Sequence, residues 1–448
     1  MRGGNLLVRN GLIVTSEAMF KADVKVVDGK IVSIGEGLSN EGVDEVIDAK
    51  GMLVLPGVVD EHVHMREPGL EFKDDFTHGT KAAALGGVTT VIEQPNTLPP
   101  VEDSNTLLAK AKLLEGKAFV DFALYGVLYD SNVHNFEDMI SSGAVGFKVF
   151  LGPTTGNIPP PSTGSLYHIL SLSAKHNVTI AFHAEDNDLV NYFTNKVRSE
   201  GRVDAKAHED ARPPICEELA VIKLATIAKR TGGHAHILHL SSKEAVEVIK
   251  EGKVRGVKLT GETCPHYLLL SNEDYVKYGT LMKVNPPIRG LTHQQALWEG
   301  IKEGVIETIG SDHAPHTVEE KKKSVWEASS GFIGVQTLLP LTLDAALKGK
   351  LQLTLLPKLL SENPAKLFKL WPRKGVINVG SDGDLVIVDP NEEFTITQEW
   401  LISKNPVTPF IGWKVRGRIK HTILRGVPIV RDGILQNVSQ GSWLKAIF

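Results

Sequence analysis

The middle of the chain alternates short apolar runs with longer amphipathic stretches. Eight runs are almost continuously apolar: LVLPGVVDEHVH, VTTVIEQPN, VDFALYGV, AVGFKVF, VTIAFHAE, HAHILHL, VKLTGETC and VIETIGSD. Segments such as FTHGTKAAALGG and CEELAVIKLATIAKRTGG separate these runs and carry apolar residues at helical spacing. Buried strands that alternate with helices favour parallel pairing, and eight such units predict an α/β fold of the (β/α)8 TIM-barrel type.

The two ends of the chain have a different pattern. Residues 1–55 contain short alternating runs broken by turn signals, as in NLLVRNGLIV and ADVKVVDGKIVSIG, and the same texture returns after residue 374 in GDLVIVDP and WKVRGRIKHTILRGVPIV. Such runs are typical of antiparallel strands. Because chain ends commonly lie close together, we expect one small β-sandwich domain built from residues 1–55 and 374–448, beside a barrel of residues 56–373.

Composition narrows the class of protein. The formal net charge of −4 over 448 residues provides no basic surface for nucleic acid. No stretch reaches the roughly 18 consecutive apolar residues of a membrane span, and the first residues have no export-type apolar segment. The only cysteines are Cys216 and Cys264, which fits a reducing compartment. We therefore expect a cytoplasmic protein that acts on a small molecule and binds neither nucleic acid nor membrane.

Polar residues end one apolar run after another. In barrels of this type the active site lies at the carboxyl ends of the strands. The residues at these ends include metal ligands and proton carriers, namely His62, His64, Asn96, Lys148, His183, His239, Glu262 and Asp312. Each of them alone is more often a hydrogen-bonded or solvated residue than a ligand, but together they favour a shared site.

Metal-assisted hydrolysis is the chemistry that these residue types have in common. His62 and His64 alternate on a strand, so both side chains can face the same ion. Imidazole and carboxylate ligands suit zinc, and His183 with His239 could hold a second ion. Asp312, in GSDHAPH, can bind a metal and also take a proton from water.

Lys148 has the wrong charge for a site that binds cations. Neighbouring cations would lower its pKa and favour the neutral amine. A neutral amine can react with carbon dioxide to form a carbamate, whose two oxygens could each bind one ion. The simpler alternative from the residue alone is a solvated or salt-bridged lysine.

The ordered set of motifs resembles the cyclic amidohydrolases, a group of metal-dependent hydrolases that includes dihydroorotase, allantoinase and hydantoinase. The likeness covers nearly the whole chain and includes HVHMREPG, GFKVF, FHAED, LHLSS, ETCPHYLLL, NPPIRG, SDHAPH and GSDGDLVIVD. It implies two Zn²⁺ ions with a hydroxide between them. One ion would be held by His62, His64, the Lys148 carbamate and Asp312, and the other by the carbamate, His183 and His239. It also implies a homodimer or homotetramer.

Four residues resemble the substrate-binding residues of dihydroorotases. Arg66 follows the two histidines and would bind a carboxylate through its guanidinium, Asn96 lies in a PNT stretch, Asn285 in NPPIRG, and His316 closes DHAPH. We therefore expect a dihydroorotase that interconverts carbamoyl aspartate and dihydroorotate in pyrimidine biosynthesis. ETCPHY and HEDARPPICEELA are closer to allantoinases and to hydantoinases of the dihydropyrimidinase type, which remain the alternative, and Gln94 stands where methionine is common. A non-catalytic assembly module of the same fold is a further alternative.

Overall fold

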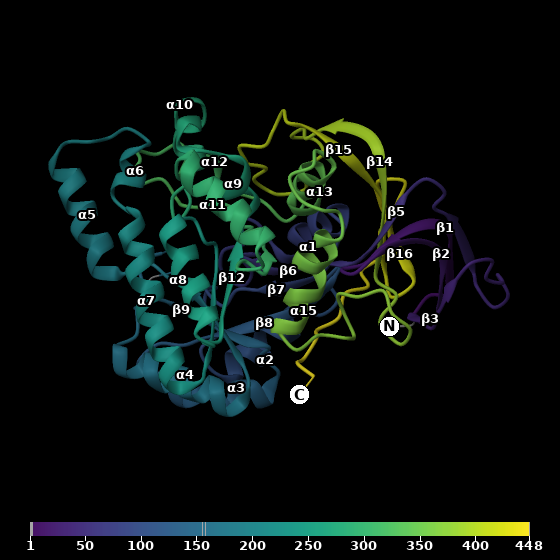
Figure 1. Ribbon diagram of the computed structural model, residues 1–448, viewed down its shortest axis with the longest axis horizontal. Helices are drawn as coiled ribbons and strands as arrows, with labels where there is room; N and C mark the ends of the chain where they lie inside the picture. The colour runs from purple at the N-terminus through teal and green to yellow at the C-terminus, as the bar shows by residue number, and fades with distance from the viewer. Residues whose placement is uncertain (1–2, 155, 157, 448) are drawn as a thin grey trace.

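The computed structural model describes residues 3–154, 156 and 158–447, and its largest unit is a barrel of eight parallel strands surrounded by helices (Figure 1). Neighbouring barrel strands follow one another in sequence, as the eight apolar runs predict. The strands are β6 (Val58–Val63), β7 (Val88–Glu93), β8 (Asp121–Val127), β9 (Gly146–Phe150), β10 (Thr179–His183), β11 (His234–Ile237), β12 (Leu259–Thr263) and β13 (Thr308–Ile309). Almost every residue in them is buried, which explains why they are apolar without alternation.

The first and last barrel strands meet just beyond β13. The His64 backbone N–H donates to the His313 carbonyl over 2.7 Å, and Val63 forms an isolated parallel bridge with His313. The segment that carries Asp312 therefore lies beside the end of β6, where His62 is on the strand and His64 directly follows it. This closure brings residues 250 positions apart in the sequence to the same edge of the barrel.

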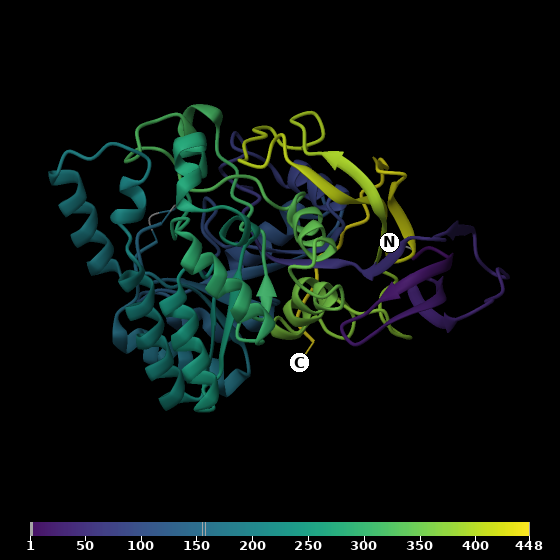
Figure 2. The same cartoon turned by 45° about the horizontal axis from the view of Figure 1, so that its top comes forward.

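Helices cover the outside of the barrel, and shorter helices lie within the connections between its strands (Figure 2). The longer helices are α1 (Phe76–Leu85), α2 (Ser104–Leu114), α4 (Thr163–His176), α5 (Asn187–Ser199), α7 (Pro214–Thr231), α8 (Lys243–Val254), α11 (Leu291–Lys302) and α13 (Leu338–Leu347). The shorter ones are α3 (Phe136–Ser142), α6 (Ala207–Asp210), α9 (Pro265–Leu269), α10 (Tyr275–Tyr278), α12 (Val318–Lys321), α14 (Leu355–Pro357) and α15 (Asn363–Leu367). Within the described residues, we find no helix that combines the length and apolar character needed to cross a membrane.

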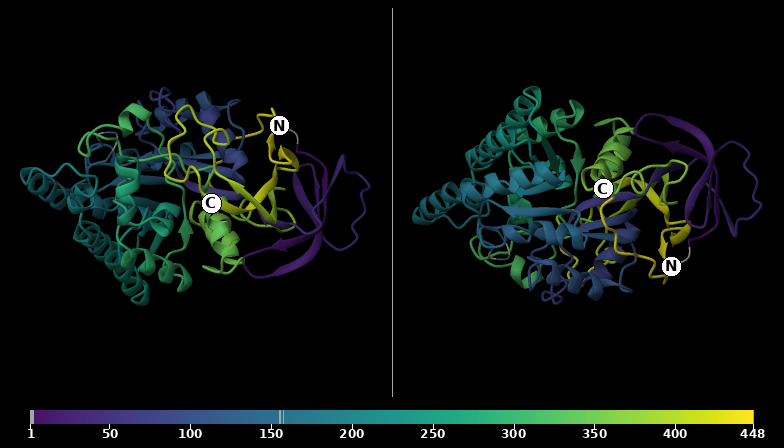
Figure 3. Two further views of the ribbon diagram at one scale, coloured as in Figure 1. Left: turned by 90° about the horizontal axis from the view of Figure 1, so that it is seen from above. Right: turned by 90° about the horizontal axis from the view of Figure 1, so that it is seen from below.

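The two chain ends form a second, mostly antiparallel sheet at one end of the molecule (Figure 3). The N-terminal part supplies β1 (Leu6–Val14), β2 (Met19–Val27), β3 (Lys30–Gly35), β4 (Glu45–Asp48) and β5 (Leu53–Pro56). The C-terminal part supplies β14 (Leu385–Thr395), β15 (Lys414–Leu424), β16 (Val427–Arg431) and β17 (Ile434–Leu435). The halves join where β5 pairs with β14, with Leu385 opposite Pro56. The fold class expected from the sequence is thereby confirmed.

One apolar run of the sequence belongs to both units. The segment Leu53–His64 is one apolar run in the sequence and crosses the expected domain limit at 55/56; the structure divides it between β5 of the end sheet and β6 of the barrel. The break lies at Gly57, where a Cβ atom would stand 2.1 Å from Thr89 Oγ1. Both sheets bury this run, so its apolar pattern contains no sign of the division. The domain limits at 55/56 and 373/374 stay a prediction.

Candidate metal centre

The carboxyl ends of the barrel strands surround a cavity. Nine of the ten candidate residues from the sequence line it, and these are His62, His64, Arg66, Asn96, Lys148, His183, His239, Asn285 and Asp312. His316, the tenth, is buried but is not on the cavity wall. The cavity wall is therefore shared by six strand ends and by loops that follow them.

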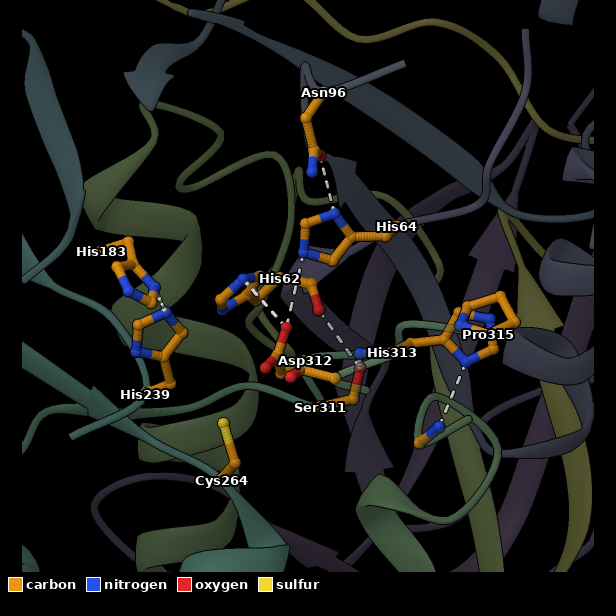
Figure 4. A network of polar contacts seen from close by, with 12 residues as sticks. His62, His64, Asn96, His183, His239, Cys264, Ser311, Asp312, His313 and Pro315 are labelled. Atoms are coloured by element: carbon orange, nitrogen blue, oxygen red, sulfur yellow. Dashed lines mark hydrogen bonds and ion pairs between the residues drawn. The ribbon is translucent and has the colours of Figure 1, made fainter. Parts of the chain in front are cut away.

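His62 and His64 meet Asp312 in the centre of this site (Figure 4). The Asp312 Oδ1 atom lies 3.2 Å from His62 Nε2 and 3.4 Å from His64 Nε2. The opposite nitrogens are held from behind: His62 Nδ1 lies 2.8 Å from Glu262 Oε1, and His64 Nδ1 lies 2.8 Å from Asn96 Oδ1. Because these oxygens accept hydrogen bonds, each Nδ1 carries the proton and each Nε2 keeps a lone pair directed at the same point.

His183 and His239 form a second pair on the opposite side of the site (Figure 4). Their facing nitrogens, His183 Nδ1 and His239 Nε2, are 3.0 Å apart. Two nitrogens that bind one tetrahedral zinc at about 2.0–2.1 Å are roughly 3.3 Å apart, so this separation is close to that of a shared ion. The ring centroids of His239 and His62 are 5.4 Å apart, which places the two pairs side by side.

Lys148 lies near both pairs. Its side chain is 1% exposed, its Nζ lies 5.0 Å from the centroid of the Phe150 ring, and its charge acts on all four imidazoles. Burial lowers the pKa of Lys148 to about 8, although Asp312 and Glu262 act in the opposite direction. A substantial fraction of this amine is therefore neutral at a mildly alkaline pH.

Burial also determines the protonation of the ligands. Burial is the main cause that lowers the pKa values of His62, His183 and His239, so these rings are neutral near pH 7. Burial opposes ionisation of Asp312, but the adjacent imidazoles outweigh it and hold the pKa of this carboxyl well below its ordinary value. Neutral imidazoles and an ionised carboxylate are the forms that bind divalent metals.

Three residues of the site have a strained backbone. Nine described non-glycine residues have positive φ angles, and Arg66 at 68°, His239 at 43° and Asp312 at 46° are among them. Each such residue costs of order 1–3 kcal/mol and persists only where the surroundings impose it. The strain directs these three side chains into the cavity from the ends of three different strands.

Arg66 supplies a fixed cation to the cavity wall. Its Nε donates to the Pro315 carbonyl over 3.0 Å, and its Nη2 lies 3.1 Å from His316 Nε2. Lys73 Nζ contacts the other nitrogen of the His316 ring over 3.0 Å. His316 therefore lies behind Arg66, a position that suits support of the guanidinium better than direct contact with a substrate. Asn285 lines the cavity, and its buried Oδ1 has no hydrogen-bond partner among the described residues.

Several cavity residues were not expected from the sequence. Phe150, Thr154, Ala314, Ser330 and Gly331 complete the wall. Phe150 and Thr154 follow Lys148 closely, so the strand-end rule could have found them. Ser330 and Gly331 come from the long loop after Asp312, which returns to the cavity.

Most of the chain matches one known protein family. The model of the Amidohydrolase family matches residues 53–429. These residues include the whole barrel but only β5, β14, β15 and the start of β16 from the end sheet. All ten candidate site residues lie within the match.

Three relatives are similar over nearly their whole lengths. A solved structure of L-hydantoinase (dihydropyrimidinase) from Arthrobacter aurescens is 34% identical, with a TM-score of 0.96 and coverage of 99% of this chain and 100% of that chain. An allantoinase of Deinococcus radiodurans is 34% identical over 448 residues and covers 98% of each chain. A dihydroorotase of Geobacter sp. strain M21 is 33% identical over 434 residues, with coverage of 96% of this chain and 100% of the relative. Overall identity therefore does not separate the three.

Proposed function

The chain belongs to the amidohydrolase family, and we propose that it is a metal-dependent hydrolase of a cyclic amide whose ring contains a ureide group. One observation carries this proposal: two pairs of neutral imidazoles, Lys148 and the Asp312 carboxylate line the same cavity at the barrel mouth. The donor set fits divalent metal ions. His62 Nε2 is buried without a well-aligned hydrogen-bond partner among the described residues, as expected of a ligand atom.

We assign the ligands to two ions, for which zinc is the proposed metal. His62, His64 and Asp312 would hold one, and His183 with His239 the other. Lys148 would bridge them as a carbamate: its neutral amine forms a bond to the carbon of carbon dioxide and releases one proton to solvent, which turns the neutral side chain into an anion. Bound divalent ions would supply activation of water and polarisation of the amide carbonyl.

The residues of the chain then divide the remaining work. Asp312 accepts the proton of the attacking water and delivers it to the ring nitrogen that leaves. Asn285 and Arg66, which also line the cavity, orient the ring, and such positioning is worth several kcal/mol. The reverse sequence of proton transfers closes the ring.

The comparisons favour a hydantoin or allantoin type of ring as the substrate. Hydantoinases and allantoinases predominate among the most similar proteins, and a dihydroorotase ranks below several of them. The expectation of a dihydroorotase as the first choice is therefore not favoured. Pyrimidine biosynthesis as the pathway has correspondingly less support than hydantoin or allantoin hydrolysis.

Dihydroorotate remains the second candidate because of one observation. The Arg66 guanidinium is 2% exposed and lines the cavity, where a carboxylate on the ring would be its natural partner. Burial lowers the pKa of Arg66 only to about 10, so it stays charged at neutral pH. A neutral ring would leave this cation without a ligand group.

A panel of substrates tests both candidates. The zinc- and bicarbonate-loaded protein is incubated with hydantoin, allantoin, dihydrouracil, dihydroorotate and carbamoyl aspartate, and ring opening or closure is followed. We expect turnover of at least one ring, loss with a chelator and recovery with zinc. No turnover of any ring by protein that holds two ions would contradict the proposed function and favour a non-catalytic module.

The variant Arg66→Met separates the acidic ring from the neutral ones. Dihydroorotate and dihydrouracil share a ring and differ in the carboxylate. If Arg66 binds that carboxylate, kcat/KM for dihydroorotate falls about 10- to 150-fold, the value of one lost charge-assisted hydrogen bond, while dihydrouracil changes little. An equal effect on both substrates would remove the argument for an acidic ring.

A further inference from the structure

Glu262 contacts one residue of each histidine pair. It lies on β12, its side chain is fully buried, and a single oxygen, Oε1, makes both contacts. The first is the 2.8 Å hydrogen bond with His62 Nδ1, and the second is a 3.0 Å hydrogen bond from the His239 backbone N–H. No other described carboxyl group has hydrogen bonds to both pairs.

The two contacts have different effects on the proposed ligands. Acceptance from His62 Nδ1 fixes the orientation of that ring and leaves Nε2 directed toward Asp312. Acceptance from the His239 backbone stabilises a residue with φ of 43°, whose strained conformation directs the imidazole toward His183. Glu262 therefore acts on the geometry of both proposed ion sites through one atom.

The surroundings preserve this position. The backbone of Glu262 accepts a 2.8 Å hydrogen bond from the Leu240 N–H, next to His239. On the other side, a Cβ atom on Gly310 would lie 2.3 Å from Glu262 Oε2 and 3.1 Å from the His62 Cβ. A glycine at position 310, just before Ser311 and Asp312, thus leaves the space that the carboxyl group occupies.

We propose that Glu262 is a positioning residue that sets the ligand geometry of both ion sites from beneath the cavity. It is not on the cavity wall, so it reaches neither substrate nor reacting atoms directly. Asn96, in contrast, lines the cavity and contacts His64, a member of the first pair. The inference rests on the proposed binuclear centre, because its effect is exerted through His62 and His239.

Metal titration tests the role of Glu262 without reference to turnover. Zinc is titrated into the metal-free full chain in bicarbonate buffer by calorimetry. We expect Glu262→Met to weaken binding of both ions about 10- to 100-fold, as the loss of such supporting contacts does elsewhere. Glu262→Gln keeps an acceptor oxygen and should recover most of the affinity for both ions.

The matched control is Glu217→Met. Glu217 is 1% exposed and its carboxylate accepts from the Ser241 N–H over 3.0 Å and from the Ser241 hydroxyl over 2.6 Å, without a described contact to the four histidines. We expect this variant to lose stability while both zinc affinities stay within about threefold, since only the contacts to ligands should affect metal binding. Equal weakening in the Glu217 and Glu262 variants would overturn the proposal.

Gly310→Ala provides a second route to the same test if Glu262→Met fails to fold. The added Cβ displaces the carboxyl group instead of removing it, so we expect both affinities to fall and the effect to be non-additive with Glu262→Gln. If Glu262→Met or Gly310→Ala binds both ions with wild-type affinity, the proposed role of Glu262 is overturned, but the proposed function is not. Wild-type protein that binds no metal would overturn the proposed function together with it.

Discussion

Lys148 and Lys374 are both 1% exposed, but they lie at opposite ends of the barrel strands. Lys148 is at the mouth, on β9, and Lys374 contacts Asp121, the first residue of β8. Lys374 Nζ lies 2.5 Å from Asp121 Oδ2, 2.9 Å from Asp382 Oδ2 and 2.7 Å from Asp384 Oδ2. Among the ion pairs of the described residues, none joins Lys148 to a carboxylate.

The partners reverse the effect of burial on the amine. Burial acts against the charge of both lysines, but the three carboxylates outweigh it and raise the pKa of Lys374 above its ordinary value. Among the four imidazoles, burial prevails and lowers the pKa of Lys148 to about 8. One buried lysine is therefore a permanent cation that joins the barrel to the end sheet, and the other is a nucleophilic amine suited to reaction with carbon dioxide.

Replacement of the lysine at the mouth should have the largest effect on activity and the least effect on folding. In Lys148→Met we expect kcat/KM to fall about 1000-fold or more and the bridged pair of ions to be lost, because the proposed anionic bridge is gone. The unfolding free energy of the metal-free chain should stay equal or rise, since a buried unpaired charge is removed. Metal analysis, substrate turnover and urea unfolding measure the three quantities. Full activity of Lys148→Met would contradict the role assigned to Lys148 in the proposed metal centre.

Replacement of the lysine at the closed end should have the opposite profile. Lys374→Met leaves three buried carboxylates without their shared cation, and we expect a loss of about 3–5 kcal/mol in unfolding free energy. Lys30→Met is the control: Lys30 also contacts Asp382, over 2.6 Å, but its side chain is 48% exposed, so about 1 kcal/mol or less should be lost. Equal costs in the two variants would contradict the assigned difference.

A rise to alkaline pH should change the contributions of the two lysines to the unfolding free energy in opposite directions. The folded pKa of Lys148, about 8, lies below the ordinary value of 10.5, so between these pH values the unfolded chain binds more protons. The stability of the metal-free wild type, measured relative to Lys148→Met in buffer without carbon dioxide, should therefore rise by up to about 3 kcal/mol from pH 8 to 10.5. Lys374 has a raised pKa, so its contribution is complete below 10.5 and is lost only at higher pH. If the difference in stability between the wild type and Lys148→Met stays constant with pH, the lowered pKa of Lys148 is refuted.

The barrel could be predicted from the sequence because burial on both faces makes most of the parallel strands rich in apolar residues, without a regular alternation of apolar and polar positions. The limit of this reasoning is visible at Leu53–His64, where two strands of different sheets share one run. Pairing between β5 and β14 joins residues more than 300 positions apart, and no local pattern specifies it. Only the short alternating apolar runs that both chain ends share indicated that the two ends belong to one sheet.

The candidate site could be predicted because strand ends converge on one face of a barrel, and nine of the ten residues do line one cavity. The position of His316 behind Arg66 could not, since it depends on how the loop after Asp312 folds. Glu262 was visible as a polar strand end, but its contact with both histidine pairs depends on three strands meeting in space. The same holds for Lys374, whose partner Asp121 is 253 positions away.

The central claim is that Lys148 becomes an anion between two ions. The most direct measurement is ¹³C NMR of protein reconstituted with zinc and ¹³C-bicarbonate, together with the zinc content of the same sample. We expect one carbamate carbon and two zinc ions per chain in the wild type, and neither the carbon signal nor the bridged pair in Lys148→Met. Two bound ions without a labelled carbon, or a label that persists in Lys148→Met, would contradict the central claim.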